Sequence, residues 1–189
     1  MTERPKSARR WKPRPVGVAI LVLCAAFLIT AIVGIALRKP ESNPIVITSA
    51  SEVHRLTGGL PQEGNRLGPS NAPVTIEVYN DLQCLSCRSW QLDVVPPLIR
   101  GPVRDGEAKI VFRHFSQSQR VMTAAAVASV AAGWQGRQWQ YLEMFFINQG
   151  QARNRGVTNQ LLTDVARGSA VAFDLEAWNR ARRSQAVKD

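Results

Sequence analysis

The sequence predicts an α/β domain built around a β–α–β unit, followed by helices and preceded by one transmembrane helix. Residues 16–37 form an uncharged apolar run, which predicts the membrane helix. Two short runs rich in β-branched and aromatic residues, 74–79 and 109–115, are separated by a segment with helical spacing. Strand, helix and strand at this spacing are typical of two parallel strands joined by a right-handed crossover.

The charge of the chain is concentrated at its N-terminus. The formal net charge is +10, and residues 1–39 hold eight Lys or Arg and one acid, so this part carries 8 − 1 = +7 and the rest +3. This distribution gives little support to a nucleic-acid-binding domain. With three cysteines in 189 residues, the chain is not a disulfide-stapled scaffold.

The apolar run is long enough to cross a bilayer. Its 22 residues would span roughly 33 Å as a helix, against a hydrocarbon core of about 30 Å. The basic residues of 1–15 place that segment in the cytoplasm and everything after residue 37 on the far side. The alternative is a cleavable signal peptide, and both readings export the domain. Cys24, inside this run, is read as a small apolar residue.

Residues 38–72 are rich in Pro, Gly, Ser and Asn, which predicts a linker between the membrane and a domain at 73–189. A short strand at 45–48 is the one element considered within it.

The first strand and the helix after it form the start of the domain. Alternation along residues 74–79 puts Val74, Ile76 and Val78 on one face. Residues 88–100 have helical spacing, and Pro96-Pro97 is expected to kink or break that helix, since each proline removes a backbone donor.

Four helices are predicted in the second half of the chain, at residues 121–133, 137–148, 159–167 and 174–183. Asp174 is the expected N-cap of the last.

Cys84-Leu85-Ser86-Cys87 lies where the first strand gives way to the helix. A cysteine at a helix N-terminus faces unpaired N–H groups and the positive end of the helix dipole, which lowers its pKa. Cys84 is therefore the expected nucleophile, Cys87 can resolve a mixed disulfide one turn later, and the Ser86 hydroxyl can donate to the thiolate. A zinc site would need further ligands, and an inert disulfide across two residues would constrain little, so both are weaker readings.

Three segments resemble the thioredoxin superfamily, in particular DsbA-like exported thiol-disulfide oxidoreductases with a helical insertion. They are LGPSNAPVTIEVYNDLQCLSC, KIVFRHF and GWQGRQWQYLEMFF, and the likeness covers residues 67–178. The resemblance implies a thioredoxin-like fold, Cys84 as the attacking and Cys87 as the resolving cysteine. It implies a structural role for His114.

The chain departs from the family pattern in its acids. Family members commonly carry a buried acid on the first strand, six residues before the first cysteine, and that position is Val78 here. Glu77 is adjacent but points to the opposite face. Asp81, three residues before Cys84, does match and is a candidate modulator together with Ser86.

A second departure concerns the cis-proline loop and hairpin that the superfamily places beside the cysteines. The last proline of this sequence is Pro102. The fold is therefore expected to be incomplete at its C-terminus, with an exposed sheet edge, unless another chain completes it. Weak catalysis is an expected consequence.

The predicted function is that of a membrane-anchored thiol-disulfide oxidoreductase acting on exported proteins, with no cofactor and no metal. The resemblance implies thiol-containing exported proteins and a DsbB-like membrane recycling protein as partners, and it favours oxidation over reduction. The alternative is a non-catalytic thioredoxin-like interaction module. A weaker third reading is delivery of a soft ion such as Cu(I) by the two thiolates.

Overall fold

The computed structural model describes residues 23–24, 26–30, 48–116 and 123–187. The chain divides into two units, Met1–Pro44 and Ile45–Asp189. In the first unit, residues 23–24 and 26–30 are helical, and Leu23, Phe27 and Ile29 are exposed. Most of the predicted membrane segment 16–37 lies outside the described residues. Within them, no helix combines the length and the apolarity needed to cross a membrane.

The second unit contains a four-stranded sheet with the order β1-β2-β4-β3. The strands are β1 (Gln62–Glu63), β2 (Arg66–Leu67), β3 (Val74–Asn80) and β4 (Ala108–His114). β3 and β4 are parallel, with Val74 opposite Ala108 and Asn80 opposite His114, so the two predicted strands and their parallel pairing are confirmed. β2 pairs antiparallel with the other side of β4, which leaves β3 at an edge of the sheet.

The segment predicted to be a linker, 38–72, differs from the prediction: from Ala50 onward it is part of the folded domain. It forms helix α2 (Ala50–Thr57) and the hairpin of β1 and β2. Val53 and Leu67 are buried in the core. The glycines that suggested flexibility serve tight turns here: Gly68 has φ +103°, and a Cβ there would lie 3.1 Å from the Ala108 carbonyl oxygen. Of the strand considered at 45–48, residues 45–47 lie outside the described residues.

Helix α3 (Leu85–Leu98) connects β3 to β4 and runs on into the short π-helix η1 (Ile99–Val103). The helix was predicted to kink or break at Pro96-Pro97, and it does not break there: both prolines lie in the last turn of α3, and the Ile99 N–H donates to the Val95 and Pro96 carbonyls. The backbone leaves helical geometry at Gly101, with φ −100° and ψ −108°.

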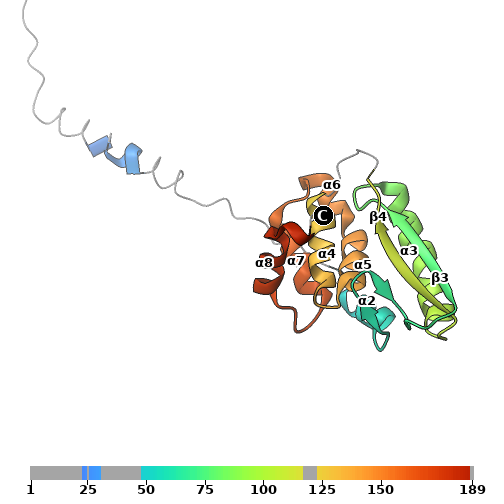
Figure 1. Cartoon of the computed structure of the whole chain (residues 1–189). Helices are drawn as coiled ribbons and strands as arrows, with labels where there is room; N and C mark the ends of the chain where they lie inside the picture. The colour runs from blue at the N-terminus through green and yellow to red at the C-terminus, as the bar shows by residue number, and fades with distance from the viewer. Residues whose placement is uncertain (1–22, 25, 31–47, 117–122, 188–189) are drawn as a thin grey trace, which may run out of the picture. The chain divides into compact units, whose positions relative to one another are not determined.

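The predicted helices of the second half are confirmed with small shifts in their bounds, and residues 121–122 of the first one lie outside the described residues. They are α4 (Ala124–Gly133), α5 (Gln138–Ile147), α7 (Asn159–Ser169) and α8 (Leu175–Arg183), and the structure adds α6 (Gln149–Arg155) and the 3-10 turn η2 (Gln185–Val187). Asp174 caps α8 by accepting hydrogen bonds from the Glu176 and Ala177 N–H groups. Figure 1 shows α4, α5, α7 and α8 grouped on one side of the domain and α3, β3 and β4 on the other, with α5 the nearest of the four helices to β4.

α5 is the central helix of the domain. It contacts α2, α3, α4 and α7, and every residue from Gln138 to Phe146 is buried. A helix buried on all sides needs no polar face, so its sequence shows no single apolar stripe. One side of α5 faces α3, the helix that carries the two cysteines.

Candidate functional site

Cys84 is the N-cap of α3, in extended geometry with φ −85° and ψ 129°. Its sulfur accepts a hydrogen bond from the Cys87 N–H at 3.2 Å and lies 3.0 Å from the Ser86 Oγ. The turn before it is held locally, since the Cys84 N–H donates to the Asp81 carbonyl at 3.1 Å and Asp81 Oδ1 accepts from the Gln83 N–H at 2.9 Å. The sequence predicts this helix-end placement, and the geometry agrees with it.

The two thiols are shifted in opposite directions. Hydrogen bonding from Cys87, and next from Ser86, holds the pKa of the Cys84 thiol below its ordinary value. Burial, and next the neighbouring Cys84, raises the pKa of Cys87. Both are free thiols and half-buried. A thiolate at Cys84 beside a protonated Cys87 suits attack by the first sulfur and a later reaction of the second.

The two acids near the cysteines in the sequence, Glu77 and Asp81, have different places. Glu77 lies away from the two sulfurs, and Asp81 holds the turn before Cys84. Glu77 is on the exposed face of β3 and pairs with Arg113 at 2.7 Å. Val78, at the family's acid position, is buried. Asp81 shapes the turn that presents Cys84. Ser86, Asp81 and the two cysteines are thus brought together, and Glu77 is not.

His114 lies at the end of β4, opposite Asn80, and is packed into the domain. Its Nε2 is 2.8 Å from the Ser129 Oγ, and its ring meets Phe112 edge-on at 4.9 Å between centroids. Burial lowers the pKa of His114 to about 4. In the described part of the chain, no group of three or more His, Cys, Asp and Glu side chains is gathered in a way that could hold a metal ion.

Gln149, the first residue of α6, was missed by the sequence reasoning. It is buried, and its Nε2 donates to the carbonyl oxygens of Leu82 at 2.8 Å and Cys84 at 3.1 Å. Gln149 therefore fixes the turn before α3 from a helix 65 residues away. A single glutamine in the polar run QGQARNR carries no sequence signal for such a contact.

An open hollow of about 400 Å³ lies beside the cysteine turn. Its lining is mainly apolar at the cysteine side, where Leu82 and Leu85 meet Ala152 and Val157 of the helical half. Leu85, between the cysteines, is 51% exposed.

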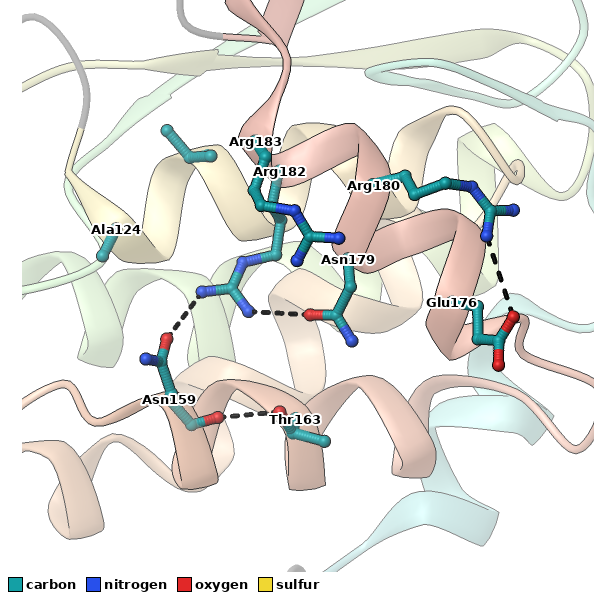
Figure 2. Close-up of a pocket in the computed structure, with 9 residues that line it drawn as sticks. Ala124, Asn159, Thr163, Glu176, Asn179, Arg180, Arg182 and Arg183 are labelled. Carbon is teal, nitrogen blue, oxygen red and sulfur yellow. Dashed lines mark hydrogen bonds and ion pairs between the residues drawn. The ribbon is translucent and has the colours of Figure 1, made fainter.

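A larger hollow, of about 1180 Å³, is shown in Figure 2 and is lined by residues of α4, α7 and α8, none of them from the cysteine turn. Arg182 donates to the Asn159 Oδ1 at 2.9 Å, and its guanidinium lies 4.5 Å from the centre of the Trp178 ring. Arg180 and Arg183 join it in the last turn of α8, where cations stabilise the end of a helix. This hollow is separate from the redox site.

A parallel β–α–β unit with a Cys-x-x-Cys at the N-terminus of its helix, and a helical layer inserted after it, defines a thioredoxin-like domain of the DsbA type. The sequence profile of the family described as thioredoxin matches residues 62–188. The chain belongs to the thioredoxin family.

Named relatives agree with this placement. The chain is 24% identical over 125 residues to "Probable disulfide bond formation protein D" of Bacillus cereus, covering 65% of this chain and 58% of that protein. It is 28% identical over 105 residues to "Disulfide bond formation protein D" of Bacillus subtilis, covering 54% and 47%. The chain thus spans about half the length of these two relatives.

Solved structures share the fold. BdbD from Bacillus subtilis, in its oxidised form, aligns with a TM-score of 0.53 at 24% identity, covering 65% of this chain and 69% of that chain. MdbA, a thiol-disulfide oxidoreductase from Corynebacterium diphtheriae, aligns with a TM-score of 0.55 at 18% identity, covering 69% and 72%. The predicted thioredoxin-like fold with a helical insertion is confirmed.

Proposed function

We propose that this chain is a membrane-anchored thiol-disulfide oxidoreductase that acts on exported proteins through Cys84 and Cys87. The observation that carries the proposal is the placement of Cys84 as N-cap of α3, where its sulfur accepts the Cys87 N–H at 3.2 Å. Relatives named as disulfide bond formation proteins support the reaction class. The resemblance favours oxidation of substrate thiols.

In the oxidising direction, a substrate thiolate attacks the Cys84 sulfur of the oxidised pair. The Cys84–Cys87 bond breaks, a Cys84–substrate disulfide forms, and Cys87 leaves and takes up a proton. A second substrate thiolate then attacks the substrate sulfur, so that the substrate disulfide forms and Cys84 leaves as a thiolate. Two electrons pass from the substrate to the pair. The lowered pKa of Cys84 makes it a good leaving group in this step.

Ser86 and Asp81 act as modulators in this scheme. The Ser86 hydroxyl, 3.0 Å from the Cys84 sulfur, donates to the thiolate when it forms. Asp81 keeps the turn in shape through the Gln83 N–H. Each oxidation of a substrate leaves Cys84 and Cys87 reduced, so a further protein, in this proposal a DsbB-like membrane protein, would reoxidise them.

Residues 16–37 form the anchor in this proposal, with residues 1–15 in the cytoplasm and the domain outside. The support is the uncharged run of 22 residues and the basic segment before it. Membranes containing the full chain should retain it after carbonate extraction, and protease added outside should remove the domain. Release of the chain by carbonate would contradict anchoring.

The reaction is tested by oxidation of a dithiol peptide with the oxidised full chain. Cys84→Ser should abolish it, and the matched control Cys24→Ser should leave it unchanged, because Cys24 lies in the separate N-terminal unit. Peptide oxidation by the Cys84→Ser variant would overturn the assignment.

A second candidate is a non-catalytic interaction module, favoured by the open edge of β3. Among the described strands β3 pairs only with β4, and Val74 and Tyr79 on it are 51% and 60% exposed. A strand from another segment or chain could pair with β3 at this edge. Cys87→Ala separates the candidates, because a catalyst accumulates mixed disulfides at Cys84 and a module does not.

A further inference from the structure

The hollow between α4, α7 and α8 carries an excess of positive charge. Its charged lining residues are Arg180, Arg182, Arg183 and Glu176, so they sum to 3 − 1 = +2. Arg180 has a partner in Glu176, one turn earlier on α8, at 3.8 Å. Neither Arg182 nor Arg183 forms an ion pair with any described residue. Two guanidinium groups in this hollow therefore lack a counter-charge within the described part of the chain.

Arg182 is the half-buried cation of the hollow. Its hydrogen bond to the Asn159 Oδ1 is short, at 2.9 Å, whereas its bond to the Asn179 Oδ1 is long, at 3.5 Å. Its Nε is buried without a hydrogen-bond partner among the described residues. Because burial removes the water that would solvate the charge, a guanidinium that has only neutral amides as acceptors is poorly compensated.

Arg183 brings a second positive charge to the same place. In Figure 2 the side chains of Arg182 and Arg183 both extend from the end of α8 toward α7. Burial lowers the pKa of Arg182; nearby Tyr141 raises it, and the charge of Arg183 lowers it. The two guanidinium groups are thus close enough to repel each other. An anion between them would remove this repulsion and supply acceptors for the remaining N–H groups.

Two helices also begin at this hollow. Ala124 is the first residue of α4 and Asn159 is the first residue of α7, and both line the hollow. The positive ends of two helix dipoles therefore add to the charge of the arginines. The site thus combines two uncompensated guanidinium groups with a polar surface that favours negative charge.

We propose that this hollow binds a phosphate monoester, with Arg182 and Arg183 as its ligands. A phosphate monoester offers three acceptor oxygens and close to two negative charges, which suits two guanidinium forks, whereas a single carboxylate satisfies one fork. The volume of about 1180 Å³ exceeds the roughly 300–1000 Å³ of common small-molecule pockets, so the phosphate belongs to a larger molecule. A soluble phosphate ester and a phospholipid headgroup both provide this group.

The test titrates the full chain in non-ionic detergent with glycerol 3-phosphate at constant ionic strength, and follows phosphorus NMR line widths and the melting temperature. A ligand present at about a hundredfold over its dissociation constant should raise the melting temperature by about 5 to 10 °C. Dihexanoyl phosphatidic acid, mixed into the same micelles, carries the same phosphate on glycerol with two acyl chains added. Tighter binding of this lipid assigns the site to headgroups, and equal or weaker binding assigns it to soluble esters.

Two variants and a matched control locate the binding. Arg182→Gln should weaken it about tenfold or more, and Arg183→Gln about threefold to tenfold, because each removes a charged donor. Arg183 is exposed, so its variant decides the question if Arg182→Gln folds poorly. The control is Arg55→Gln, since Arg55 is also an exposed arginine in the last turn of a helix, α2. That helix meets the opposite end of α7, where the His54 Nε2 lies 3.0 Å from the Gly168 carbonyl oxygen, so this variant should bind as the parent does.

Three results would overturn the inference. The first is that neither phosphate compound binds. The second is an equal loss of affinity in Arg55→Gln and Arg183→Gln, which would show attraction by net charge alone. The third is a hexaglutamate peptide that binds as tightly as glycerol 3-phosphate, which would point to an acidic protein partner instead. The hollow includes no residue of the cysteine turn, so these results are independent of the redox reaction.

Discussion

Two buried ionisable side chains give the stability of the domain opposing dependences on pH. His114, packed against Ser129 and Phe112, has a pKa lowered from 6.5 to about 4 by burial. Between about pH 6.5 and pH 4, His114 is therefore protonated in the unfolded chain and neutral in the folded chain. This contribution to stability is complete above pH 6.5 and is lost as the pH falls toward 4.

Glu143 acts in the other direction. Burial raises its pKa from 4.5 to about 7, so the folded chain keeps a proton that the unfolded chain releases. The contribution is complete below pH 4.5 and is lost as the pH rises through 7. The change from 6.5 to about 4 for His114 and the change from 4.5 to about 7 for Glu143 each correspond to about 3 kcal/mol, so the two opposite pH dependences nearly cancel between pH 4.5 and 6.5.

When either residue is replaced, the free energy of unfolding should show the pH dependence that the remaining residue causes. The free energy of unfolding, from urea titrations between pH 4 and pH 8, is compared with wild type at each pH, so that background titrations cancel. Glu143→Gln should gain about 3 kcal/mol relative to wild type on going from pH 4 to pH 8. His114→Gln should gain about 3 kcal/mol on going from pH 8 to pH 4.

Glu107→Gln is the control: Glu107 is exposed, so this variant shows how much the removal of a surface carboxylate changes the free energy of unfolding. Differences from wild type that stay constant with pH for both Glu143→Gln and His114→Gln would refute the reasoning, because neither group would then titrate differently in the folded chain.

Three further predictions concern individual side chains. Gln149→Leu removes two hydrogen bonds to the turn before α3, so it should lower the free energy of unfolding by about 2 kcal/mol, whereas Gln151→Leu on the same helix should not; equal effects in urea unfolding would contradict this. Ser86→Ala should raise the pKa of Cys84 toward its ordinary value and slow its alkylation at pH 6; an unchanged rate would show that the hydroxyl does not stabilise the thiolate. Asp174→Ala should cost about 1 kcal/mol by thermal or urea unfolding, because two N–H groups of α8 lose their acceptor, and no change would count against the cap.

The β–α–β unit and the cysteine turn could be predicted because their signals are local. The β-branched run of β3 and the two-residue spacing of Cys84 and Cys87 are both visible within a few residues. The helix after Thr123 is alanine-rich, and Asp174 is a good N-cap residue, so these elements could be read directly as well.

The missed features depend on contacts between distant segments. β1 and β2 are two residues each, too short to show alternation; β2 is a strand because it pairs with β4, and β1 because it pairs with β2. Gln149 and Gln91 are ordinary polar residues by sequence. Their partners, the carbonyl of Cys84 and the carboxyl of Glu143, are 65 and 52 residues away. No periodicity can reveal such pairs.

The opposite shifts in the pKa values of the two thiols, with Cys84 as the attacking and Cys87 as the resolving cysteine, are measured most directly by alkylation of each cysteine. The reduced full chain is treated with iodoacetamide from pH 5 to pH 10, and the modification rates of Cys84 and Cys87 are followed separately by peptide mass spectrometry. We expect Cys84 to titrate below the ordinary thiol pKa of about 8.5 and Cys87 to titrate above it. A Cys87 that titrates at or below Cys84 would contradict this expectation.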